Sequence, residues 1–134
     1  MWAILLSFIF TPVFGGIVCG LNWRAMGKEE LSVRSFSFMR STLFIMVLYI
    51  FAEPMLRGIP YTQYVLLAIM VGLWLVWTFT DGIKQLRHVN DTYGEDYEHK
   101  MWAKCISWGV GGWVAYYALA ITYVIGLHLL GTNL

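Results

Sequence analysis

A few ionisable side chains stand inside or beside apolar stretches of this chain, and any chemistry would begin with them. Asp81 follows an apolar stretch that starts near Tyr61, Glu53 directly precedes Pro54, and Arg40 precedes the apolar run 42–52. A charge at membrane depth is costly and is tolerated where it serves an ion, a proton or a partner, or pairs with an opposite charge. We therefore expect any activity to involve Asp81, Glu53 or Arg40.

The surroundings of Asp81 suggest a polar site at one end of a helix. Positions 74, 77, 81, 85 and 88 fall on one face at 3.6 residues per turn, and they carry two tryptophans followed by Asp81, Gln85 and His88. One interpretation is an ion pair or polar cluster that ends the helix at the headgroups. The other is a vestibule for an ion, a proton or a partner. The candidates for the group opposite are Arg40, Arg24 and Asn22.

Glu53 allows two interpretations as well. It lies four residues before Arg57, and this acid-first spacing favours an ion pair on the helix surface. It also lies beside Pro54, which removes a helical hydrogen bond and can leave carbonyl groups free to assist a proton or cation site.

The chain offers no set of catalytic groups. Cys19 and Cys105 form no CxxC motif, and we interpret both as small packing residues. Of the histidines only His88 and His99 could meet, with Glu95 or Glu98 as further donors, whereas a zinc site needs three or four clustered donors. No Ser-His-acid grouping, catalytic carboxylate pair or phosphate-binding loop can be assembled. We expect a protein that is not an enzyme and has no metal and no cofactor.

Composition places these residues in a membrane. Hydrophobic residues make up 59% of the 134 and charged residues 13%, about half the charge of a soluble domain. The net charge of +1 and the lack of a basic run exclude nucleic acid as a partner. A crossing takes about 20 apolar residues, and four are predicted: Trp2 to Leu21, the region around 42–52, Tyr61 to Thr80, and Trp102 or Ile106 to Leu130.

Three of the predicted spans have features that affect their shape or length. Pro12 should bend the first helix. The run 42–52 is short, so a crossing must recruit its flanks, and a re-entrant or interfacial helix is the alternative. The third helix should extend past the membrane and end between Asn90 and Gly94, because glycine suits the helix C-terminus.

The distribution of basic residues predicts the orientation. Eight of the nine Lys and Arg lie in the first and third connections, and only Arg57 lies in the second. The positive-inside rule then places the first and third connections in the cytoplasm and both termini outside. Gly58 to Pro60 predicts a tight outer turn that makes the second and third helices a hairpin. The fold class is an all-α four-transmembrane-helix bundle forming one domain, 1–134.

Small residues mark two faces where helices could approach closely, because association in lipid depends on close backbone packing. Gly16 and Gly20 lie at GxxxG spacing in the first helix, and Gly111, Ala115 and Ala118 share one face of the fourth. We expect these faces to contact each other or a second copy of the chain.

A short signature follows the first span. It resembles small uncharacterised bacterial inner-membrane proteins in which a Pro and Gly span is followed by an Asn, aromatic, basic, x, Leu or Met, Gly pattern. The matching residues are Thr11, Pro12, Gly15, Asn22, Trp23, Arg24, Met26 and Gly27, and a later run of Gln85, Val89, Tyr93, Gly94, Tyr97 and Trp102 is also similar. The resemblance implies a bacterial inner membrane and a structural turn over Asn22 to Gly27, and it implies no activity.

These observations favour a small inner-membrane protein that acts by binding another protein within the bilayer. Small four-span proteins without catalytic groups include immunity proteins against pore-forming toxins, an analogy of architecture only. The alternative is an ion channel or transporter subunit that uses Glu53 or Asp81. The expected partners are the lipid bilayer, a membrane protein or toxin, and a further copy of the chain.

Overall fold

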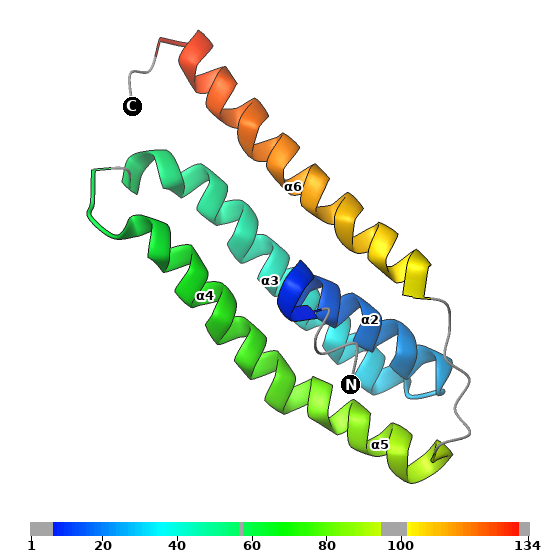
Figure 1. Ribbon diagram of the computed structural model, residues 1–134. Helices are drawn as coiled ribbons and strands as arrows, with labels where there is room; N and C mark the ends of the chain where they lie inside the picture. Colours follow the sequence, from blue (N-terminus) through cyan, green and yellow to red (C-terminus); the bar gives the residue numbers. More distant parts are fainter. Residues whose placement is uncertain (1–6, 57, 95–101, 132–134) are drawn as a thin grey trace.

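The computed structural model describes residues 7–56, 58–94 and 102–131, and every regular element in these ranges is helical. A turn of helix at residues 7–10 precedes α2. The elements that follow are α2 (Pro12–Ala25), α3 (Glu29–Leu56), α4 (Thr62–Trp77), the π-helix η1 (Thr78–Gly82), α5 (Ile83–Tyr93) and α6 (Trp102–Leu129). In Figure 1, α4, η1 and α5 form one continuous rod beside α3, with α2 against both and α6 on the other side of α3.

Three stretches within the described residues are long and apolar enough to cross a membrane: Glu29–Leu56, Tyr64–Tyr93 and Ile106–Leu129. This agrees with an all-α membrane protein. The run 42–52, which is short by itself, lies in the C-terminal half of α3, whose 28 residues extend about 42 Å. That length exceeds the roughly 30 Å of a hydrocarbon core.

The first predicted span is not one continuous helix. The chain breaks at Thr11, whose φ of 135° is far from helical, and Pro12, the first residue of α2, has no backbone N–H to continue the ladder. The expected bend is therefore a break. The 14 residues of α2 extend about 21 Å, less than a hydrocarbon core. Residues 1–6 of the predicted span lie outside the described residues.

The predicted hairpin between the second and third helices is present (Figure 1). α3 ends at Leu56, and the Ile59 N–H donates to the Leu56 carbonyl at 2.9 Å. Tyr61 takes a left-handed conformation with φ of 69° directly before α4. The Thr62 hydroxyl donates to the carbonyls of Leu56 and Ile59 at 2.9 and 2.6 Å, so the first residue of α4 ties the turn together.

The rod of α4, η1 and α5 continues to Tyr93, and Gly94 ends it with φ of 58°. The third helix continues beyond Thr80 as predicted, and its predicted end near Gly94 is confirmed. The π-helix in its middle was not predicted.

The small-residue face of α2 packs against α3 and not against α6, which was one of its two expected partners. A Cβ at Gly16 would lie 3.0 Å from the Met39 Cβ and 3.2 Å from the Ser35 carbonyl oxygen. A Cβ at Gly20 would lie 3.0 Å from the Phe36 ring. A Cβ at either position would be tighter than most Cβ contacts, so Gly16 and Gly20 favour the close approach of α2 and α3.

α6 touches the rest of the described chain at few points. The Trp113 indole N–H donates to the Phe10 carbonyl at 2.8 Å, and Gly109 packs against the Phe10 ring. Further along, the rings of Phe51 and Tyr123 meet edge to face with centroids 4.8 Å apart.

The small-residue face of α6 is open. Nothing lies within 4 Å of a Cβ built at Gly111, and Ala115 and Ala118 are exposed. No residue of the most apolar window of Ile106–Leu129 is buried within the structure. Of the two contacts expected for this face, the one with α2 is therefore not formed among the described residues, and the one with a second copy of the chain stays a prediction.

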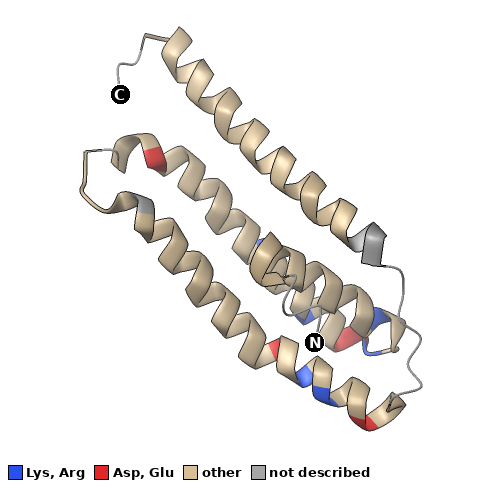
Figure 2. Cartoon of the chain, in the orientation of Figure 1, with Lys and Arg blue, Asp and Glu red and all other residues tan. Residues whose placement is uncertain are grey.

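Charged residues gather at one end of the described helices, where α2 ends, α3 begins and α5 lies (Figure 2). Glu53 lies apart from them, three residues before α3 ends at Leu56. The charge asymmetry found in the sequence is thus also an asymmetry of the folded molecule.

Candidate functional site

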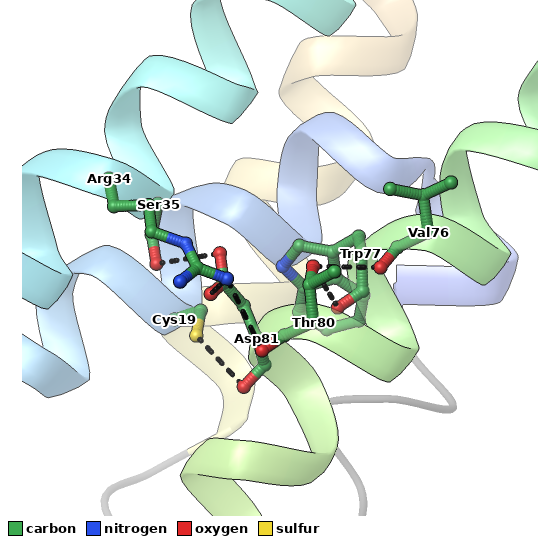
Figure 3. A network of polar contacts seen from close by, with 7 residues as sticks. All are labelled: Cys19, Arg34, Ser35, Val76, Trp77, Thr80 and Asp81. Atoms are coloured by element: carbon green, nitrogen blue, oxygen red, sulfur yellow. Dashed lines mark hydrogen bonds and ion pairs between the residues drawn. The ribbon is translucent and has the colours of Figure 1, made fainter.

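Asp81 lies buried in η1 and faces α3. Its carboxylate oxygen Oδ1 is 2.9 Å from Nη2 of Arg34, and the Ser35 hydroxyl donates to Oδ2 at 3.5 Å (Figure 3). The Asp81 side chain is 4% exposed, whereas that of Arg34 is 51% exposed. A buried carboxylate thus meets a guanidinium that reaches the surface. Its partner is Arg34 and none of the three candidates that the sequence suggested.

The π-helix widens the turn around Asp81, and polar side chains complete its backbone hydrogen bonds. The Ile83 N–H donates five residues back, to the Thr78 carbonyl. The Thr80 hydroxyl donates to the Val76 carbonyl at 2.8 Å, and Arg34 donates to the Thr80 carbonyl at 3.5 Å (Figure 3). Arg34 therefore contacts both the carboxylate and the backbone of the widened turn.

Gln85 extends the polar cluster toward α2, as its position on the Asp81 face predicts. Its amide N–H donates to the Cys19 carbonyl at 2.9 Å, and the Asn22 amide donates to the Gln85 Oε1 at 3.3 Å. The Cys19 thiol in turn points at the Asp81 carbonyl, with 4.0 Å between Sγ and oxygen (Figure 3). Asn22 thus belongs to the cluster, through Gln85 and not through Asp81.

Tryptophans form the apolar part of the same contact. Trp23 and Trp77 are each 1% exposed and pack around Cys19. The ring of Trp77 fits against Gly15, where a Cβ would lie 3.0 Å from it. The His88 ring lies tilted against Trp23, with centroids 5.3 Å apart and an angle of 42° between the planes. The aromatic and polar face predicted on the third helix therefore binds α2.

A row of small polar residues on α3 completes the site and was not singled out in the sequence. Ser32, Ser35 and Thr42 are 1%, 0% and 0% exposed. The Ser32 hydroxyl donates to the Gly20 carbonyl at 2.9 Å. Their spacing of three and seven residues places them on one helical face, and this spacing is the signal that would have identified them.

Some buried polar atoms of this region have no hydrogen-bond partner among the described residues. They are the indole nitrogens of Trp23 and Trp77 and the hydroxyls of Thr42 and Thr78. A buried polar group left unpaired costs about 1–3 kcal/mol. In the described ranges, no protein group donates to or accepts from these four buried atoms.

The other candidate residues lie apart from Asp81. Arg40 is exposed on α3, and Glu53 is half-buried near the end of α3 at Leu56. The suggested partner of Glu53, Arg57, and the suggested partner of His88, His99, lie outside the described residues. The candidate set therefore divides into a cluster around Asp81 and two separate charges.

The signature over Asn22 to Gly27 is mostly helix. Asn22, Trp23 and Arg24 form the last turn of α2, and the reversal into α3 takes place at Gly27, with φ of 72°. Arg24 reaches Glu29 across this turn at 3.6 Å, with both side chains exposed. The turn predicted over Asn22 to Gly27 is therefore shorter than expected.

The arrangement joins three helices through one buried charge pair. No group of three or more His, Cys, Asp or Glu side chains within the described ranges is placed to hold a metal ion. Each carboxylate oxygen of Asp81 has one partner among the described residues, Arg34 at Oδ1 and Ser35 at Oδ2. The hydrogen bonds and the ion pair of this cluster connect α2 and the rod to α3. No family model, curated protein or solved structure matches the chain.

Proposed function

We propose that this protein acts by binding another protein within the bilayer, and that α6 is the helix that meets the partner. The observation that carries the proposal is the openness of α6: none of its most apolar window is buried in the structure. The other long helices contribute buried residues to a shared core, as Thr42 and Trp77 do.

The surface of α6 suits a helical partner better than lipid alone. Gly111 and Ala118 leave room for a backbone to approach, and small residues at such spacing are common where membrane helices associate. Beside them runs an apolar groove of about 450 Å³, lined by Phe10 and by α6 residues between Val110 and Ile121.

We propose the inner membrane of a bacterium as the location, with four crossings and both termini outside. The sided distribution of basic residues supports this orientation. In this setting the partner would be a membrane-inserted, pore-forming toxin, and the protein would serve as its immunity protein.

The test is protection from a pore-forming toxin encoded beside this gene. Expression of the protein should restore survival, and Gly111→Leu should abolish protection, because a leucine there blocks the approach of a partner helix. Gly72→Leu is the matched control, since a Cβ at Gly72 on α4 also meets nothing within 4 Å.

Loss of protection in both variants, or in neither, would exclude α6 as the binding helix. If the wild-type protein gives no protection, the toxin is excluded as the partner. Crosslinking from position 111 to a second copy of the chain would then assign the surface to a homo-oligomer.

One observation favours a second candidate, an ion channel or transporter subunit. Asp81 is a buried carboxylate on a π-helix, an element often found at functional sites. In this case purified protein in liposomes should conduct or exchange ions, and Asp81→Asn or Glu53→Gln should abolish the flux. Liposomes that stay as tight as protein-free ones would exclude this function.

A further inference from the structure

The π-helix sets the rotational position of α5 relative to α4. A π turn accommodates one more residue than the α-helical turn that it replaces. If residues 78–82 rewound as α-helix, α5 would rotate by ~100°, the angle between consecutive residues of an α-helix. Each position of α5 would then be occupied by the residue that precedes its present occupant in the sequence. This change needs no movement of α4 along its own axis.

Arg34 is the group outside the rod that contacts the widened turn at two points. Its guanidinium lies 2.9 Å from Oδ1 of Asp81 and 3.5 Å from the Thr80 carbonyl oxygen. Both acceptors belong to η1, and the guanidinium belongs to α3. Loss of Arg34 therefore removes an ion pair and a backbone partner from the same turn.

The alternative register would also have favourable contacts. After an advance of one residue, Lys84 would take the place of Gln85 beside the Cys19 carbonyl. Arg87 would take the place of His88 on the face of Trp23, where a cation is attracted to the ring. Lys84 and Arg87 are both exposed in the present register.

We propose that Arg34 is the latch of a register switch in the rod: its contacts with Asp81 and Thr80 hold the π turn, and its release lets α5 turn by one residue against α2. The two states differ in the face of α5 that they present, since Lys84 and Arg87 are outside in one and face α2 in the other. Half of the Arg34 side chain is exposed, so the latch is reachable from the surface. The proposal does not depend on the identity of a binding partner.

Thiol crosslinking in membranes tests the register directly. In a background of Cys19→Ser and Cys105→Ser, one reporter combines Asn22→Cys with Gln85→Cys, and the other combines Asn22→Cys with Lys84→Cys. With Arg34 present, a short bifunctional reagent should link the first pair several-fold faster than the second. With Arg34→Ala the preference should reverse, and Asp81→Asn should move it in the same direction.

Deletion of Phe79 provides the control. Phe79 is 70% exposed in η1, and its removal takes out the extra residue, so the turn becomes α-helical with α5 in its present register. The first pair should then crosslink fast whether or not Arg34 is present. This deletion also covers the case in which Arg34→Ala alone fails to fold, because the double variant should fold and link the first pair.

An Arg34→Ala protein that folds and keeps the wild-type preference overturns the proposal. So does a double variant that fails to fold as the single variant does, because Arg34 would then be needed for more than the π turn.

Discussion

Asp81 and Arg34 form one ion pair, but Asp81 is buried and Arg34 is half-exposed. Replacing the one should therefore change the unfolding free energy by a different amount from replacing the other. Arg34→Ala leaves a buried carboxylate without its counter-charge and should cost about 3 kcal/mol of unfolding free energy. Asp81→Asn leaves a half-exposed guanidinium that water can solvate, and should cost about 1 kcal/mol. Denaturant titration of the protein in detergent micelles measures both values.

Glu29→Gln is the control for this comparison. It breaks the 3.6 Å pair of Arg24 with Glu29, in which both side chains are exposed, and should change stability by less than about 0.5 kcal/mol. If Arg34→Ala and Asp81→Asn lower the unfolding free energy equally, the expected effect of the burial of Asp81 is contradicted.

At the scale of residues, the sequence correctly predicted which side chains of the third helix lie together. It did not predict which side chain of another helix pairs with Asp81. Asp81 and Gln85 were placed on one face by helical spacing, and they do lie together. The guanidinium opposite Asp81 comes from Arg34, which sequence reasoning did not consider. Hydropathy does not define how α3 is rotated about its axis, and that rotation selects Arg34 over Arg40.

Among the elements, the contact of α2 with α3 should be the most sensitive to added volume. Gly16→Ala places a Cβ 3.0 Å from the Met39 Cβ and 3.2 Å from a backbone oxygen, where overpacking costs about 1–3 kcal/mol. Gly72→Ala on α4 meets nothing within 4 Å. Both changes gain about 1 kcal/mol in helix propensity, so their difference isolates the packing and should be about 2 kcal/mol. A thermal denaturation series in detergent measures it.

Equal stability of the two alanine variants would show that α2 does not pack closely on α3. The glycine spacing in α2 correctly marked a close contact, but it carried no information on which helix supplies the other side. α3 is that helix because the short turn at Gly27 joins it directly to α2, and because Ser32 and Ser35 provide a narrow polar surface.

For the molecule as a whole, the testable question is the number of crossings. Reporter enzymes active only outside the cytoplasm should be active when fused at Gly58 or Leu134, and inactive when inserted at Gly27. The expectation rests on eight of nine basic residues on one side. A fluorescent protein that matures only in the cytoplasm provides the reciprocal readout.

Because the helix breaks at Thr11, a reporter fused at residue 1 is the measurement that distinguishes four crossings from three. A reporter at residue 1 that is active outside means that the chain crosses despite a 14-residue α2. Cytoplasmic activity there would contradict the four-crossing topology and leave three crossings.

The sequence by itself determined the class of molecule, the charged end and the hairpin, because apolar content, charge counts and a Gly-x-Pro turn act locally. Tertiary structure alone decided three further features: the contact of α2 with α3, the pairing of Asp81 with Arg34, and the exposure of the most apolar window of α6. Each of these depends on how helices rotate and shift against one another. In the rod that rotation depends on a single π turn, whose extra residue no hydropathy pattern reveals.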